Sequence, residues 1–240
     1  MLKRIFSVWK HNLSELYTTL LIMLVCWIVG IIILAALLKF DLEATTCVTI
    51  GTLLAVFIVI FMNIIFGIIS FGCSFNTAIS FGSTRKEFLV AEGVTAYLNM
   101  AIETAIILIM HSMETALYKM IYTGRECEDM GAFLSNYRLV LGIVLVIPAV
   151  RMFCGAFILK YRRVAYWTLW GLWMVGFMGA GNFADYIEEN PESTAAKIFT
   201  GISDFAIGMP GIAQIAAFVL VMCIIISGTV LLIRKQAVQA

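Results

Sequence analysis

Residues 80–90 read SFGSTRKEFLV and interrupt a long apolar region with charge. Apolar sequence runs up to this stretch from Val48, and a largely apolar helical pattern leaves it from Phe88. Thr84, followed three residues later by Glu87, fits a capping box, in which the two side chains bond each other's backbone N–H groups at the start of a helix. The stretch therefore predicts two membrane-spanning helices that are joined by a tight, charged turn.

The composition is that of a membrane protein. Apolar residues make up 62% of the 240 residues and charged residues only 13%, and the mean hydropathy is +1.00. Soluble domains contain about 45–50% apolar and about 25% charged residues. We therefore predict an integral membrane protein in contact with the lipid bilayer. The net charge of +1 does not suggest a nucleic-acid partner.

Six apolar segments are long enough to cross a bilayer core of about 30 Å. We expect an all-α integral membrane protein with a single transmembrane domain over residues 1–240, an N-terminal interfacial amphipathic helix and short extracellular helices before the last span. The spans are expected at 17–38, 47–72, 88–115, 137–159, 164–184 and 211–233. The interfacial helix is expected at 1–14, a cytoplasmic helix at 80–90 and the extracellular segment at 185–210.

Basic residues gather in alternate connections, and this sets the predicted orientation, because cytoplasmic loops are enriched in Lys and Arg. The predicted cytoplasmic residues are Lys3, Arg4, Lys10, Arg85, Lys86, Lys160, Arg162, Arg163, Arg234 and Lys235. The predicted outer residues are Lys39, Lys119, Arg125, Arg138 and Lys197. We expect a multi-pass protein of the plasma membrane with both termini in the cytoplasm.

The first turns of the chain combine apolar residues at helical spacing with basic residues elsewhere around the helix. This pattern is typical of a helix that lies in the membrane interface. The residues expected to hold it there include Lys3, Arg4, Phe6, Trp9 and Lys10.

Four polar residues of the third predicted span share one helix face. Glu92, Asn99, Glu103 and Glu114 are separated by 7, 4 and 11 residues, and eleven residues overshoot three helical turns by only about 20°. Glu92 and Glu114 are expected near the membrane surfaces within reach of water, and Glu103 well inside. Because an ionised carboxylate facing lipid is costly, this face should line a cavity or meet another helix. A translocation path, a proton-binding carboxylate and a structural hydrogen bond all stay open.

Two further polar residues lie inside predicted spans. Asn63 is at mid-depth of the second span, where an amide most often bonds to a neighbouring helix. Arg151 lies three residues after Pro148, too deep to act only as an end anchor. It is a candidate partner of the acidic face, through Glu92 or Asn99.

No motif predicts catalysis by this chain. The sequence contains no G-x-x-x-x-G-K-[ST] phosphate loop, no G-x-S-x-G and no H-E-x-x-H. His111 and Glu114 could share a metal, but no third ligand follows nearby, so no metal is expected. Cys47 and Cys127 both fall at the predicted outer face, which leaves a disulfide between them open.

The chain resembles the permease subunits of the type-2 ABC exporter family, the small six-span kind common in Gram-positive bacteria. Residues 81–89, FGSTRKEFL, are similar to the Gly-x-Ser/Thr-Arg-Lys-x-Phe pattern at the same turn of such permeases. The basic N-terminal helix, the apolar segment before the last span and the lack of an ATPase in the chain agree with this resemblance.

The resemblance implies that residues 80–90 form a coupling helix that docks onto an ABC ATPase subunit. The residues it assigns to this docking are Thr84, Arg85, Lys86, Glu87 and Phe88. It also implies a second permease subunit, identical or paralogous, and export as the expected direction. ATP and Mg would be bound by the partner ATPase, with no cofactor on this chain and no enzymatic activity of its own.

Two other functions stay open. An ion-coupled secondary transporter would use the Glu103 face and would require spans one to three and four to six to form an inverted repeat. A non-transporting membrane anchor or immunity protein would tolerate loss of Glu103 and Arg151, and would copurify with a target instead of an ATPase.

Overall fold

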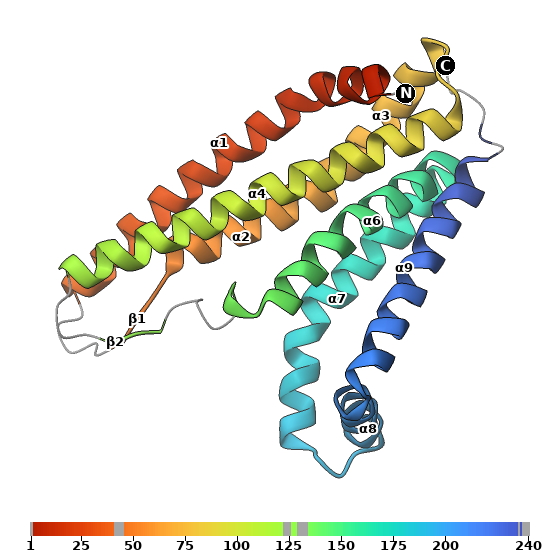
Figure 1. The fold of residues 1–240 in the computed structure, drawn as a ribbon. Helices are drawn as coiled ribbons and strands as arrows, with labels where there is room; N and C mark the ends of the chain where they lie inside the picture. The colour runs from red at the N-terminus through yellow and green to blue at the C-terminus, as the bar shows by residue number, and fades with distance from the viewer. Residues whose placement is uncertain (1, 41–45, 122–125, 129–133, 235, 237–240) are drawn as a thin grey trace. The chain divides into compact units, whose positions relative to one another are not determined.

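Long helices account for almost all of the chain that the computed structural model describes, which is residues 2–40, 46–121, 126–128, 134–234 and 236 (Figure 1). The helices divide between two compact units, and the single transmembrane domain expected over residues 1–240 stays a prediction. The first unit is Met1–Gly155 with Ala237–Ala240, and the second is Ala156–Gln236.

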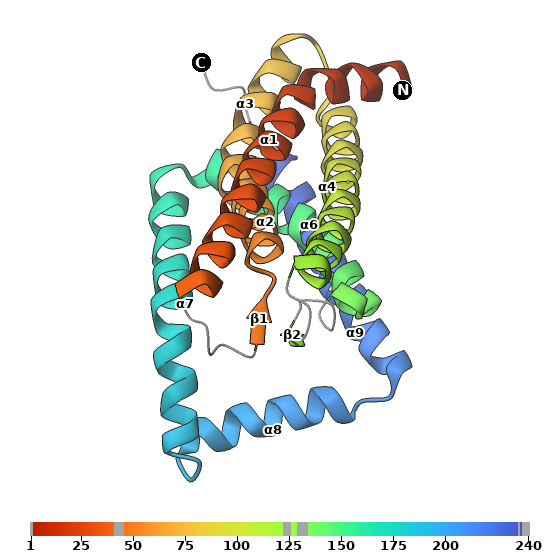
Figure 2. The ribbon, with the colours of Figure 1, turned by 90° about the vertical axis from the view of Figure 1, so that its left-hand side faces the viewer.

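The first unit contains four long helical elements. They are α1 (Leu2–Phe40), a continuous helix made of α2 (Ile50–Phe61), η1 (Met62–Phe66) and α3 (Gly67–Ser80), then α4 (Arg85–Ile121), and most of α6 (Tyr137–Tyr161). Helices α1, α2 and α4 pack against one another, as Figures 1 and 2 show. The segment η1 is a single π-helical turn, in which one extra residue shifts the side chains that follow around the helix.

Five helices of the described chain are long and apolar enough to cross a membrane. They cover Leu13–Leu37, Ile50–Ser80, Arg85–Ile121, Tyr137–Tyr161 and Gly211–Ile233. The protein is therefore a multi-pass membrane protein. The fifth predicted span, residues 164–184, corresponds to α7 (Arg163–Glu189), whose 27 residues would extend about 40 Å. Its tryptophans, tyrosines and glycines lower its hydropathy, and its crossing of the membrane stays a prediction.

Two short helices expected from the sequence are not separate elements in the described chain. Helix α1 runs unbroken from Leu2 to Phe40, and it changes direction in its N-terminal part, as Figure 2 shows. Polar residues such as Asn12 and Ser14 each lower the stability of a long helix by only about 0.5 kcal/mol relative to alanine. They therefore do not end the helix. The side chains of Lys3, Arg4, Phe6, Trp9 and Lys10 lie outside the described part of the structure. Likewise, residues 80–90 form the end of α3, a turn and the start of α4.

The two ends of the first unit differ in structure. At one end, which we call the turn end, residues 81–84 connect α3 to α4. At the other, the strand end, β1 (Thr46–Val48) follows α1 and β2 (Glu126–Glu128) follows α4, and the two strands pair in parallel. The register places Cys47 opposite Cys127. Their side chains are outside the described part, so the question of a disulfide between them stays open.

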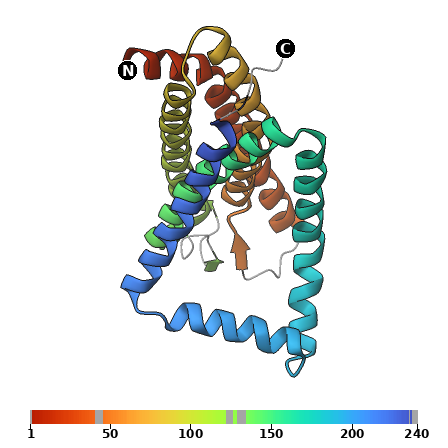
Figure 3. The same cartoon turned by 90° about the vertical axis from the view of Figure 1, so that its right-hand side faces the viewer.

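The second unit contains α7, α8 (Thr194–Gly208) and α9 (Gly211–Ile233). Helix α8 runs crosswise from the end of α7 to the start of α9 (blue in Figure 3). Ser193 caps it, since its hydroxyl accepts a hydrogen bond of 3.2 Å from the Ala196 N–H. A single helix, α8, thus lies within residues 185–210, where the sequence predicted short helices.

Candidate functional site

One face of α4 carries a row of buried polar side chains, which we call the α4 polar face: Glu92, Asn99, Glu103 and Glu114. Each is at most 3% exposed. Its three glutamates follow one another at intervals of eleven residues, or about 16 Å along the helix. The prediction that these four residues share one helix face is confirmed. The expectation that Glu92 and Glu114 reach water is wrong, because neighbouring helices cover both of them.

Glu92, the glutamate nearest the turn end, belongs to an ion triad with Arg151 of α6 and Glu15 of α1. Arg151 Nη2 lies 3.1 Å from Glu92 Oε1 and 3.3 Å from the carboxylate of Glu15. Ser70 of α3 donates a further hydrogen bond of 3.1 Å to Glu15. The predicted pairing of Arg151 with Glu92 is confirmed, and the triad together with Ser70 ties four helices together.

Arg151 reaches the triad by passing over Gly67, the first residue of α3. A Cβ atom at Gly67 would lie 2.6 Å from Arg151 Cδ and 2.7 Å from Nε, which is closer than two such atoms can approach. The Nε atom of Arg151 is buried and has no hydrogen-bond partner among the described residues. The triad therefore depends on Nη2 and on the small size of Gly67.

Glu103 lies in the middle of α4 and bonds to Asn63 of η1. Asn63 Nδ2 donates to Glu103 Oε2 at 2.6 Å and to the backbone carbonyl of Val59 at 3.0 Å. The bond to Val59 fixes the amide with its nitrogen towards Glu103. The expectation that Asn63 bonds to a neighbouring helix is confirmed, and its place in a π-helical turn is a feature often found at functional sites.

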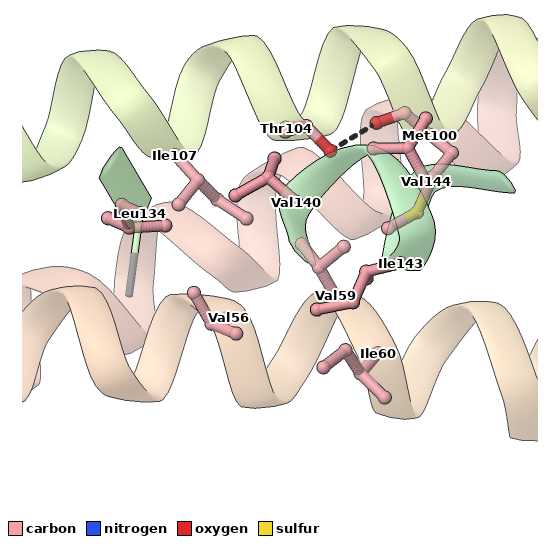
Figure 4. A pocket seen from close by; sticks show the side chains of 10 residues that line it. All are labelled: Val56, Val59, Ile60, Met100, Thr104, Ile107, Leu134, Val140, Ile143 and Val144. Carbon is pink, nitrogen blue, oxygen red and sulfur yellow. Dashed lines mark hydrogen bonds between the residues drawn. The ribbon is translucent and has the colours of Figure 1, made fainter. Parts of the chain in front are cut away.

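Apolar side chains surround the contact between Glu103 and Asn63. Met100 and Ile107, one turn before and after Glu103, belong to the buried core of the first unit. Figure 4 shows an adjoining apolar pocket between α2, α4 and α6. Its lining residues are Val56, Val59, Ile60, Met100, Thr104, Ile107, Leu134, Val140, Ile143 and Val144. The hydroxyl of Thr104 is turned to its own helix, where it bonds the Met100 carbonyl at 2.8 Å.

Glu114 lies towards the strand end and accepts hydrogen bonds from five donors. The backbone N–H groups of Gly51 and Thr52 lie at 3.0 and 2.7 Å, and the Thr52 hydroxyl at 2.6 Å. Trp27 Nε1 and the Tyr118 hydroxyl complete the set at 3.2 and 2.7 Å. The carboxylate also caps the N-terminus of α2, where the helix dipole favours a negative charge. No group of three or more metal-ligating side chains occurs among the described residues.

The turn end forms the capping box that the sequence predicts. The Thr84 N–H donates to Glu87 Oε2 at 3.0 Å, and the Glu87 N–H donates to Thr84 Oγ1 at 3.2 Å. Gly82 has a φ of +80°, a left-handed conformation that favours glycine. Arg85 and Lys86 are exposed. The turn is thus a fixed, charged structure between two long helices.

Phe88 does not take the place expected for it. It is 1% exposed, and its ring packs edge-on against Phe71 and Phe75 of α3, with centroids 5.3 Å away in both cases. It therefore holds α3 against α4 and offers no surface for docking. Phe81, at the turn itself, is 84% exposed.

Sequence reasoning missed four residues that complete the buried sites: Glu15, Trp27, Thr52 and Tyr118. Three of them come from helices other than α4, and each looks ordinary in an apolar or interfacial segment. Only Tyr118 had a local signal, because it follows Glu114 by four residues and so lies on the same helix face.

Comparisons of this chain with protein-family models, with curated proteins and with solved structures found no match.

Proposed function

We propose that this chain is the membrane-spanning permease subunit of an ATP-driven exporter of the type-2 ABC kind. In this proposal the turn end faces the cytoplasm and docks onto a separate ATPase subunit, which binds ATP and Mg. A second permease subunit, identical or paralogous, completes the path across the plasma membrane, and α7 crosses the membrane so that both termini are cytoplasmic. The observation that carries the proposal is the continuity of the exposed turn with the helix that holds the α4 polar face.

The packing at the turn end supports a mechanical link. The capping box of Thr84 and Glu87 fixes the first turn of α4, and Phe88 clamps α4 to α3 through two aromatic contacts. A force on the turn would therefore move both helices. Helix α4 carries Glu103, and α3 continues into the π-helical turn that carries Asn63, so such a movement would reach the buried polar contact.

The exposed groups at the turn suit a protein partner. Phe81 presents an aromatic ring that is 84% exposed, and Arg85 and Lys86 lie close by in the sequence. Aromatic residues and arginine are enriched among the residues that dominate binding energy at interfaces. We therefore replace Phe88 by Phe81 as the apolar docking contact.

Copurification of an ABC ATPase with this chain from its native membranes tests the proposal. The tagged full-length chain is purified in mild detergent, as wild type and as the double variant Phe81→Ala/Arg85→Glu. The control is Lys197→Glu, an exposed charge reversal in the second unit, where Lys197 pairs with the exposed Glu192 at 2.8 Å.

We expect the wild type and the control to retain the ATPase, and the double variant to retain at most about a tenth as much, as for loss of an interface hot spot. Absence of any ATPase from the wild-type sample, repeated in nanodiscs, would contradict the proposal. The ion-coupled transporter would then be the better candidate, since Glu103 is a buried carboxyl group in the membrane interior.

A further inference from the structure

We propose that Glu103 is a proton-binding site: a carboxyl group that holds a proton, while Glu92 and Glu114 on the same face remain ionised. This inference rests on the buried contacts of α4 and does not depend on an ATPase partner. The ligand is the proton itself, which binds the carboxylate reversibly to give the carboxylic acid.

The first step is the number of partners that each glutamate has. Glu114 accepts hydrogen bonds from five donors at a helix N-terminus, and Glu92 pairs with a guanidinium group. Glu103 is 2% exposed, and its one hydrogen-bond partner among the described residues is the neutral amide of Asn63. Burial disfavours the charged form of a carboxyl group unless cations or several donors compensate. By this measure, Glu103 is the glutamate of the row that lacks compensation.

The second step is the charge around Glu103. Among the described residues, the charged groups that act on Glu103 from other elements are Arg151 of α6 and Glu15 of α1, and Glu92 and Glu114 lie on α4 itself. Arg151 is shared between Glu15 and Glu92, so the triad has one cation for two carboxylates. The triad therefore offers Glu103 no net positive charge, and a bound proton is what would neutralise the Glu103 carboxylate.

The third step is what could release the proton. Asn63 belongs to η1 and Glu103 to α4, so any displacement between these two elements lengthens their 2.6 Å contact and changes the surroundings of the carboxyl group. Occupancy by the proton would then depend on the conformation of the helices. The Val59 carbonyl holds Asn63 in place from its own helix, so movement of α4 is the simpler route.

Infrared difference spectroscopy on the full-length chain in nanodiscs tests the inference. A protonated carboxyl group gives a C=O stretch that is distinct from that of a carboxylate and that shifts when H2O is replaced by D2O. We expect this band in the wild type at neutral pH, its reversible loss at high pH, and its absence from Glu103→Gln. Glu103→Asp keeps a carboxyl group and should retain the band at a shifted frequency.

Two outcomes would overturn the proposal. One is a folded wild-type protein without a protonated-carboxyl band at neutral pH. The other is a band that persists unchanged in Glu103→Gln, which would assign it to another group. Failure of Glu103→Gln to fold would also count against a neutral Glu103, because glutamine has nearly the shape of the protonated side chain. All of these outcomes leave the permease proposal untouched, since no ATPase takes part.

Discussion

Glu114 and Glu103 lie eleven residues apart on one face of α4, and both are almost fully buried, but their surroundings are opposite. Glu114 meets five hydrogen-bond donors at the N-terminus of α2. Glu103 meets one amide among apolar side chains. Burial is therefore not what separates a structural glutamate from one that can exchange a proton. What separates them is the number and charge of the partners of each carboxyl group, and substitutions can test this difference.

The largest effect is expected for Glu114→Gln. The amide keeps the shape of the side chain but brings an NH2 group against donors that need an acceptor. Hydrogen bonds to a charged group contribute about 1.5–3 kcal/mol each, and the change disturbs several of them at once, so we expect a loss of at least about 3 kcal/mol in the free energy of unfolding. Denaturation of the purified protein in detergent measures it. A loss below about 1 kcal/mol, the usual net value of one hydrogen bond, would show that Glu114 is not held as an anion.

The difference between the two glutamates shows what the sequence could and could not predict. Helical spacing alone placed Glu92, Asn99, Glu103 and Glu114 on one face, and it did so because α4 is a single regular helix. The same reasoning could not tell that Glu114 is covered, because its cover comes from Trp27 of α1 and Thr52 of α2. The hydrophobic periodicity of a helix does not indicate which other helices pack against it.

The turn end shows the same limit on a smaller scale. The capping box follows from Thr84 and Glu87, which are three residues apart, and the structure has it. Sequence reasoning assigned docking to Phe88 and gave Phe81 no role of its own, because which ring is buried depends on where Phe71 and Phe75 lie on α3. Likewise, no local sequence pattern predicted the π-helical turn in which Asn63 bonds to Glu103.

An intermediate effect is expected for Gly67→Ala, which acts on Glu92, the remaining glutamate of the row. The added methyl group would lie 2.6 Å from Arg151 Cδ, so the guanidinium must move away from Glu92 and Glu15. Overpacking of this kind costs about 1–3 kcal/mol. The measurement is again detergent denaturation, with Gly171→Ala as the control, because outside its own helix backbone no atom of the described chain lies within 4 Å of a Cβ at that position. Equal stability of the two variants would show that Arg151 can leave the triad without loss.

A smaller effect is expected for Asn63→Ala. It removes the bonds from Asn63 Nδ2 to Glu103 and to the Val59 carbonyl, and hydrogen bonds of this type contribute about 0.5–1.5 kcal/mol each. If Glu103 holds a proton, the carboxyl group loses a partner but gains no unpaired charge. We therefore expect a loss of about 1–2 kcal/mol. A loss as large as that of Glu114→Gln would mean that Asn63 was compensating a full negative charge.

The smallest effect is expected for Glu103→Gln, and it decides the comparison. Glutamine reproduces a protonated glutamate in shape and charge, and its carbonyl oxygen can accept the same hydrogen bond from Asn63 Nδ2. We expect the free energy of unfolding to change by less than about 1 kcal/mol, the size of one net hydrogen bond. The same change at Glu114, made under the same conditions, is the matched control, because it removes a carboxyl group of equal burial from the same helix face. If both variants lose the same large amount of unfolding free energy, both glutamates are held as anions. The number of donors around each glutamate would then have no bearing on its charge. If only Glu114→Gln is destabilised, the protein keeps one glutamate of the row as a fixed anchor and leaves the other free to gain and lose a proton.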